Sequence, residues 1–211
     1  MNEKVHEPKR RITYYIIKPI ARFLLFFVYN IRCKGRKNIP KKGGFILASN
    51  HISYTDPVIL VSFCPRTCHF MAKSDLFKHP LLALFFRSMN AFPVKRGTSD
   101  NRSLVYAQKV LNSSWVLGIF PEGGTSKDKI PKRAKSGIAY LAKNTGADVL
   151  PVSIYRTPGK RQLRPKTTVR FGTVIKNEEL GLTEEYSPKQ LRAASQLIMN
   201  KIVALWEKQH E

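Results

Sequence analysis

The stretch from Gly43 to Phe63 constrains the fold most strongly. A turn pair, Gly43-Gly44, leads into the apolar run Phe45–Ala48, which is typical of a buried strand. A second apolar run ends at Phe63 and begins with Asp56-Pro57; Pro suits the first position of a helix, and Asp suits its cap. The order strand, loop, helix predicts one repeat of an α/β sheet, and the loop leaving such a strand is a common place for an active site.

The rest of the chain repeats this alternation of strands and helices. Such alternation indicates an α/β sandwich, in which helices flank a mixed but mainly parallel sheet. We expect Pro151 to move its strand to an edge or irregular position, because proline cannot donate a ladder hydrogen bond. Further strands are expected at His69–Ala72, Ala91–Val94, Trp115–Phe120, Val149–Tyr155 and Thr167–Ile175, and helices at Leu81–Arg87, Asp100–Asn112, around Ile138–Ala142 with a stop at Gly146, and from Ser187 with a capping box at Gln190 through Leu205.

The loop after the first strand carries His51 and Asp56, five residues apart. A neutral histidine takes a proton from a hydroxyl when its second ring nitrogen donates to a carboxylate, so the pair fits a general-base dyad. The alternative is that Asp56 only caps the helix and His51 only bonds to backbone. Spacing alone favours this simpler alternative.

The charge balance points to a polyanionic partner. The 211 residues, enough for one domain, include 37 Lys and Arg against 14 Asp and Glu, a formal net charge of +23. Nucleic acid, an anionic membrane face and an acidic protein all fit such a surplus. The sequence contains none of the usual nucleic-acid-binding motifs, so we expect no nucleic-acid partner.

The most apolar stretch, Ile12–Ile31, is interrupted by Lys18 and Arg22 and is too short of uninterrupted apolar residues for a membrane span. No small-residue cleavage site of a signal peptide follows it. Its helical spacing places the basic residues on one face and the apolar residues on the other, which favours a helix lying in a membrane interface. Pro19 is expected to break or kink this helix, or to begin a second one. The alternative is a helix packed on the protein's own core.

The three cysteines, Cys33, Cys64 and Cys68, do not suggest a disulfide framework. A metal cluster of Cys64 and Cys68 with His69 and His79 is disfavoured, because no second half closes a tetrahedral site. We therefore expect no metal and no cofactor, and a reduced environment facing the cytosol.

Four blocks in fixed order give the chain a family resemblance: Asn50-His51 with Asp56, Phe92–Arg96, Phe120–Gly123 and Val149–Val152. Together they resemble the glycerolipid acyltransferases, in particular the bacterial 1-acylglycerol-3-phosphate acyltransferases, over about residues 11–156. The resemblance implies the glycerol-3-phosphate acyltransferase-like sandwich. It implies a membrane-docking helical element at 1–34, and we expect the acyltransferase domain at 35–211.

The resemblance also implies roles for the residues of the blocks. His51 and Asp56 are the catalytic pair, and Arg96, beside Lys95, helps hold a phosphate of the acceptor. Glu122 is placed to accept a hydrogen bond from a glycerol hydroxyl, and Gly123-Gly124 permits close backbone approach. Family members often have arginine where Thr125 stands. We expect Lys127, or another residue of the basic loop 127–135, to bind the phosphate in place of that arginine, or Arg96 to contribute more to phosphate binding. The acyl side of the site is lined by Val149, Leu150, Pro151 and Val152.

The implied reaction is transfer of a fatty acyl group from acyl carrier protein or coenzyme A to the free hydroxyl of lysophosphatidate, with His51 as base. The expected place is the cytoplasmic face of the cell membrane, as a monotopic or peripheral protein on anionic lipid. Two alternatives stay open. One keeps the chemistry with another lysophospholipid or lipid-linked acceptor, and the other is a non-catalytic basic membrane-binding protein.

Overall fold

A seven-stranded sheet organises the computed structural model, which describes residues 7–9, 11–95, 100–157 and 163–211. Its strand order is β1-β7-β6-β2-β5-β3-β4, and every neighbouring pair is parallel except β6–β7. This confirms the mixed, mainly parallel sheet. The strands are β1 Asn30–Lys34, β2 Phe45–Ser49, β3 Cys68–Lys73, β4 Ala91–Val94, β5 Val116–Ile119, β6 Asp148–Arg156 and β7 Lys166–Phe171.

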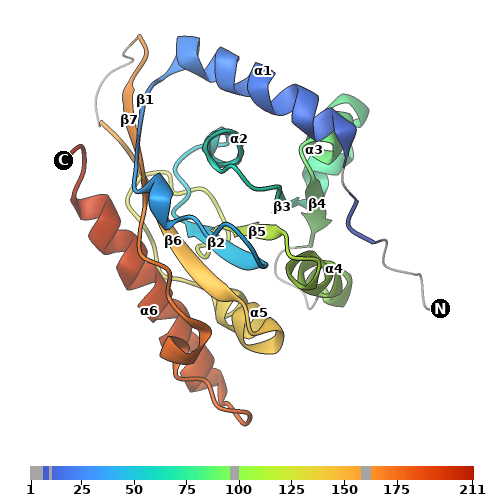
Figure 1. Ribbon diagram of the computed structural model, residues 1–211, viewed down its shortest axis with the longest axis vertical. Helices are drawn as coiled ribbons and strands as arrows, with labels where there is room; N and C mark the ends of the chain where they lie inside the picture. Colours follow the sequence, from blue (N-terminus) through green and yellow to red (C-terminus); the bar gives the residue numbers. More distant parts are fainter. Residues whose placement is uncertain (1–6, 10, 96–99, 158–162) are drawn as a thin grey trace.

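Helices cover both faces of the sheet (Figure 1). Helix α2 packs on one face and lies between the sheet and α1, whereas α4, α5 and α6 pack on the other face. The helices are α1 Ile12–Val28, α2 Asp56–Phe63, α3 Pro80–Ser88, α4 Asn101–Asn112, α5 Gly137–Thr145 and α6 Pro188–Glu207, with short 3-10 turns η1 Arg36–Asn38, η2 Ser74–Phe77 and η3 Asn177–Leu180.

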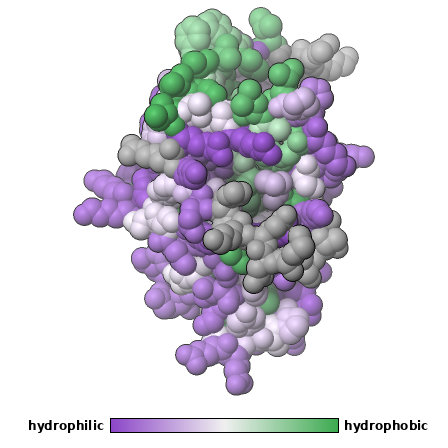
Figure 2. Space-filling view, turned by 90° about the vertical axis from the view of Figure 1, so that its right-hand side faces the viewer, coloured by the Kyte–Doolittle hydropathy of each residue, from purple (hydrophilic) through white to green (hydrophobic). Residues whose placement is uncertain are grey.

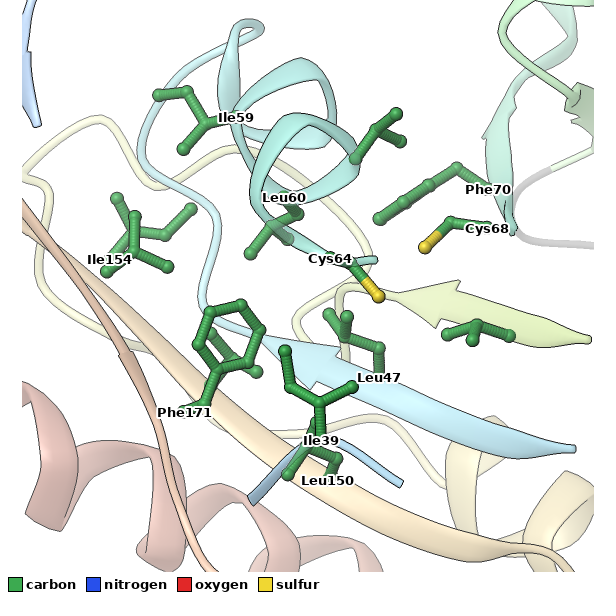
Figure 3. Packing of buried hydrophobic residues seen from close by; sticks show 14 of the residues in the cluster. Ile39, Leu47, Ile59, Leu60, Cys64, Cys68, Phe70, Leu150, Ile154 and Phe171 are labelled. Atoms are coloured by element: carbon green, nitrogen blue, oxygen red, sulfur yellow. The ribbon is translucent and has the colours of Figure 1, made fainter. Parts of the chain in front are cut away.

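The core on the α2 side explains why this helix is rigidly placed (Figure 3). Leu60 of α2 and Cys64, which follows the helix, point toward the side of the sheet that carries Leu47 and Leu150, and Ile59 belongs to the same core cluster. All five side chains are fully buried. Burial of each aliphatic side chain contributes about 1.5–3 kcal/mol, so the loop between β2 and α2 is held at both ends by well-packed elements.

Two predicted helix boundaries are confirmed by their caps. Ser187 accepts a hydrogen bond from the Gln190 amide, and the Gln190 side chain accepts one from the Ser187 amide at 2.7 Å, which is the predicted capping box. Helix α5 ends at Gly146, whose φ of 65° lies in the left-handed region that glycine adopts without strain.

The prediction that Pro151 occupies an edge strand is wrong, since β6 lies between β7 and β2. The predicted irregularity is present, however. The regular pairing of β6 with β7 ends at Val152↔Phe171 and resumes only as an isolated bridge at Val149↔Ile175. Pro151 stands at this interruption, so its missing N–H removes no ladder bond there.

The N-terminal helix α1 runs without a break through Pro19, so the predicted break and the second helix are wrong. It ends at Val28 rather than at Ile31, because Asn30–Lys34 forms the edge strand β1 against β7, a strand that the sequence pattern did not indicate. No helix among the described residues is long and apolar enough to cross a membrane.

The basic stripe of α1 faces the protein, which its amphipathic pattern did not predict. Lys18 Nζ donates to the carbonyl oxygen of Cys64 at 2.6 Å, at the end of α2, and Arg22 lies over the Phe63 ring. A cation at this end of a helix is favoured by the helix dipole. Most of the large apolar side chains of α1 point outward, whereas Tyr14, Ala21 and Leu25 are buried against the protein.

Together with α3, the outer side of α1 forms a surface that we call the α1–α3 face (Figure 2, where apolar residues gather at the top). Phe23 and Phe27 on α1 are 63% and 56% exposed, and Leu81 and Leu84 on α3 are 72% and 69% exposed. Large contiguous apolar patches on a soluble surface mark interaction sites. The remaining members of the face are Ile12, Ile16, Ile20, Leu24, Phe26, Val28, Leu82 and Phe85.

Candidate functional site

The carboxyl end of β2 places His51 beside Asp56. His51 Nδ1 lies 3.0 Å from Asp56 Oδ2, and both side chains are buried. A carboxylate oxygen only accepts hydrogen bonds, so Nδ1 carries the proton and Nε2 carries the lone pair. The pair therefore has the arrangement of a general base with its orienting carboxylate.

Asp56 does not cap α2, contrary to the simpler alternative. Its Oδ2 instead accepts the backbone N–H groups of Ile52 and Ser53, both at 2.7 Å, and the structure shows no side-chain cap at this helix start. The backbone of the loop thus wraps around the Asp56 carboxylate. Three donors converge on one oxygen, which fixes the loop and the carboxylate together.

Asn50 anchors the loop to the neighbouring strand. Its Nδ2 donates to the Ile154 carbonyl at 2.9 Å, and its Oδ1 accepts the Ile154 amide at 2.8 Å. The bonds are buried and continue the pairing of β2 with β6 beyond the last ladder residue. Asn50 stood in the first block, but the sequence offered no sign that it works as a backbone mimic.

The segment after β5 closes over His51. The His51 amide donates to Glu122 Oε1 at 2.9 Å, and the His51 carbonyl accepts the Ser126 amide at 2.7 Å. The Phe120 ring stacks on the imidazole, with ring centroids 4.0 Å apart and an interplanar angle of 17°. The ring position of His51 is therefore set by Asp56 on one edge and Phe120 on one face.

Glu122 joins the site to the basic loop, residues 127–135. Its second oxygen, Oε2, accepts the Lys132 amide at 3.1 Å. Burial raises the pKa of Glu122, against the amides of His51 and Lys132, which favour the ionised form. The structure thus gives this carboxylate a scaffolding role; a contact with a glycerol hydroxyl stays a prediction.

A cavity of about 490 Å³ opens at the carboxyl ends of β3, β4 and β5, and neither His51 nor Asp56 is among the residues that line it. Phe120 contacts both this cavity and the His51 ring. Its apolar wall includes Leu104 and Ile138, and Lys95 and Lys135 also line it. A mainly apolar cavity with a few charged groups is the usual form of a small-molecule site.

The cations expected to hold a phosphate differ in where they lie relative to the cavity. Arg96 lies outside the described residues. Lys95 lines the cavity, and its amide donates to Asp100 at 2.8 Å. Lys135, which no sequence block singled out, reaches the same cavity by crossing Gly123: a Cβ at Gly123 would lie 2.9 Å from the Lys135 chain. Gly123, with φ of 72°, makes room for this passage.

The other predicted site residues lie away from the cavity. Thr125, Gly124 and Glu122 are partly exposed and adjoin it in the chain without lining it. Val149, Leu150, Pro151 and Val152 are buried in the interior strand β6 and do not line it either. Their side chains are used by the two cores that pack on the sheet, which is the role a buried strand has without any ligand.

The cysteines and the remaining histidines do not join the site. No group of three His, Cys, Asp or Glu among the described residues is placed to hold a metal ion. Cys64 and Cys68 are free and buried. Burial, with a smaller contribution from the charge of Arg11, lowers the pKa of His69 to about 3, so this histidine is a neutral core residue stacked on Trp115.

Comparisons with known proteins agree with this geometry. The family model described as Acyltransferase matches residues 30–155. The 1-acyl-sn-glycerol-3-phosphate acyltransferase of Bacillus subtilis is 27% identical over 142 residues, covering 67% of this chain and 70% of the relative. The enzyme of that name from Borreliella burgdorferi is 29% identical over 150 residues, covering 70% and 60%.

One solved structure has a closely similar fold. The crystal structure of the 1-acyl-sn-glycerophosphate (LPA) acyltransferase PlsC from Thermotoga maritima superimposes with a TM-score of 0.72 at 24% sequence identity. The superposition covers 92% of this chain and 78% of that chain. The expected α/β sandwich flanked by helices is thereby confirmed.

Proposed function

The chain belongs to the acyltransferase family, and from this premise we propose that it transfers a fatty acyl group from a thioester to the free sn-2 hydroxyl of 1-acyl-sn-glycerol 3-phosphate, which gives phosphatidate. The single observation that carries the chemistry is the buried hydrogen bond between His51 Nδ1 and Asp56 Oδ2. The names of the relatives from B. subtilis and B. burgdorferi support the acceptor.

The dyad assigns the proton steps. With Nδ1–H held by Asp56, Nε2 of His51 takes the proton of the acceptor hydroxyl as its oxygen attacks the thioester carbonyl. An ester C–O bond forms, the C–S bond breaks, and the proton on His51 passes to the leaving thiolate. Asp56 stabilises the imidazolium between the two steps. No residue of the chain becomes acylated.

We propose that the acceptor's phosphate binds at the mouth of the cavity. Lys95 and Lys135 line it, and Arg96 follows Lys95 in the chain. A fixed cation paired with a phosphate contributes about 1.5–3 kcal/mol, which favours a phosphate-bearing acceptor over a neutral glyceride. The thioester of acyl carrier protein or of coenzyme A is drawn to the positive surface because both donors are acidic.

The α1–α3 face is proposed to lie on the anionic, cytoplasmic surface of the cell membrane, without crossing it. Its apolar side chains are exposed, and a cation stands beside them: the guanidinium of Arg164 lies 4.6 Å from the Phe26 ring centroid. Apolar insertion with flanking cations is how interfacial helices bind anionic lipid. An acceptor that resides in the bilayer would then reach the site without leaving the lipid phase.

The test of this function is product formation by the purified protein. Wild type, His51→Ala and His79→Ala are incubated with lysophosphatidate and either oleoyl-carrier protein or oleoyl-CoA, and the lipids are analysed by mass spectrometry. We expect phosphatidate from wild type and from His79→Ala, whose histidine is an exposed residue before α3, and a loss of at least about a hundredfold in His51→Ala. Near-normal phosphatidate formation by His51→Ala would end the proposal.

A further inference from the structure

Asp56 has one carboxylate oxygen that its loop does not use. Oδ2 takes the three donors described above, whereas Oδ1 is buried and has no hydrogen-bond partner among the described residues. A cation stands close to it: Nη2 of Arg156 lies 4.0 Å from Oδ1. Nη2 is itself buried without an acceptor in the described structure. Asp56 Oδ1 and Arg156 Nη2 thus face each other with opposite charges, and neither has a hydrogen-bond partner among the described residues.

Burial makes this pairing energetically important. The side chain of Asp56 is 0% exposed and that of Arg156 is 9% exposed. An ionised carboxylate removed from water needs a compensating charge, because the cost of an unpaired buried ion is several kcal/mol. The two atoms lie about 1 Å beyond normal hydrogen-bond distance, so a small displacement closes the contact directly.

Arg156 is held in this place by residues of two other elements. Its Nε donates to Thr167 Oγ1 of β7 at 3.2 Å, and its guanidinium lies 4.4 Å from the ring centroid of Tyr29, the residue that ends α1. The Tyr29 hydroxyl in turn bonds to Thr55 Oγ1 at 3.0 Å, immediately before Asp56. A cation stacked on an aromatic face and tethered through Nε has little freedom to leave.

We propose that Arg156 is a positioning residue for acyl transfer, which keeps Asp56 anionic and oriented so that His51 presents Nε2 to the acceptor. The inference rests on the proposed function. It extends the His51–Asp56 pair to three residues, in which Arg156 of β6 supports Asp56 and Asp56 orients His51. Tyr29 supports Arg156 by stacking on its guanidinium. Arg156 acts through Asp56 and touches no substrate.

The support acts on the carboxylate oxygen that the loop leaves unused. Arg156 Nη2 faces Asp56 Oδ1, whereas His51 Nδ1 and the two loop amides bind Oδ2, so the guanidinium can hold the carboxylate without competing for the oxygen that orients the imidazole. Among the described residues, Glu122 is bonded to the His51 amide and the Tyr29 hydroxyl to Thr55. Loss of the Arg156 guanidinium leaves these hydrogen bonds in place and removes the charge beside Oδ1.

The experiment compares Arg156→Met, Arg156→Lys and the matched control Arg170→Met, which removes another partly buried guanidinium from the adjacent strand β7. Values of kcat and KM for lysophosphatidate are measured for each, together with the melting temperature. In Arg156→Met we expect kcat to fall roughly tenfold with little change in KM, because the oriented base is needed only in the transition state. Arg156→Lys, which keeps the charge, should restore most of kcat, and Arg170→Met should keep the wild-type kcat.

A second readout does not depend on activity. The Nδ1–H resonance of His51, followed by NMR in the intact protein, reports its hydrogen bond to Asp56. This resonance should move in Arg156→Met and stay at the wild-type position in Arg170→Met. Unchanged kcat and an unchanged Nδ1–H resonance in folded Arg156→Met would overturn the proposal, as would an equal loss of kcat in Arg170→Met. If wild type forms no phosphatidate at all, the proposed function fails instead, and the NMR shift alone then decides whether Arg156 acts on the dyad.

Discussion

The dyad loop and the α1–α3 face are opposite kinds of surface. At the loop, residues 50–56, the side chains of Asn50, His51 and Asp56 are buried, and each is bonded to a defined partner on β6, on the post-β5 segment or within the loop. On the face, aromatic and aliphatic side chains stand in solvent. Buried polar networks rigidify a site, whereas large exposed apolar patches mark surfaces that bind a partner. Under the proposed function, the molecule thus separates a preorganised chemical site from a surface completed by binding.

The largest expected effect falls on the loop. In Asp56→Asn, the amide cannot accept from all three donors, and His51 loses the carboxylate that selects its tautomer. We expect kcat to fall by about a thousandfold or more, from kinetics with lysophosphatidate. Vesicle binding should be unchanged, since Asp56 is far from solvent. A variant that keeps its rate would show that the loop is only a structural turn.

The next effect concerns the face. Replacing Phe23, Phe27, Leu81 and Leu84 by serine removes apolar area that membrane insertion would bury, at about 1–2 kcal/mol for each side chain. Co-sedimentation with anionic vesicles should weaken by roughly a hundredfold or more, and salt should weaken the wild type only in part because insertion is not screened. Ile130→Ser, an exposed apolar residue elsewhere, is the control. If the four-serine variant binds vesicles as well as Ile130→Ser does, the α1–α3 face is not the membrane-binding surface.

Lys135 extends the comparison to the cavity that it lines. Lys135→Gln should raise KM for lysophosphatidate roughly tenfold and leave KM for a monoacylglycerol unchanged, because only the first acceptor carries a phosphate. Lys127→Gln, in the same basic loop but not lining the cavity, is the matched control. The same assay on Arg96→Ala tests the arginine that the family resemblance assigns to the phosphate. Equal losses on both acceptors would show that neither cation is a phosphate ligand.

The smallest effect is on stability, through His69. Its pKa in the folded protein is about 3, below the ordinary 6.5, so the unfolded chain binds the extra proton and stability falls as pH drops from 6.5 toward 3. The slope is about 1.4 kcal/mol per pH unit where only the unfolded state is protonated. His69→Phe should flatten this decline in melting temperature between pH 6.5 and 4 without changing kcat. An unaltered decline would mean that other groups cause it.

Sequence reasoning located the chemistry better than the geometry around it. The residue types at positions 51 and 56 limited the possible chemistry, and the apolar runs limited the strands. The partners of these residues come from distant chain segments: Glu122 is 71 residues from His51, and Ile154 is 104 residues from Asn50. No local pattern encodes such pairings, which explains why the anchoring role of Asn50 and the place of Arg156 were not recognised, and why Lys135 was indicated only as a member of the basic loop.

The α1 helix shows the same limit. Its periodicity correctly separated a basic from an apolar side, but periodicity does not say which side meets the protein. The free carbonyl at the end of α2 accepts from Lys18, which turns the basic side inward. Likewise, Pro151 was compatible with an interior strand because β7 interrupts its pairing at that residue. Both outcomes depend on a neighbouring element and not on the segment itself.

The separation of the two regions is tested most directly by one kinetic comparison. Asp56→Asn and the four-serine variant of the α1–α3 face are assayed on a short-chain lysophosphatidate that stays monomeric in solution, and on long-chain lysophosphatidate in anionic vesicles. The account predicts that the four-serine variant keeps wild-type kcat on the monomeric acceptor and loses activity only on vesicles, whereas Asp56→Asn is impaired on both. Loss of activity by the four-serine variant on the monomeric acceptor, with its melting temperature unchanged, would contradict it.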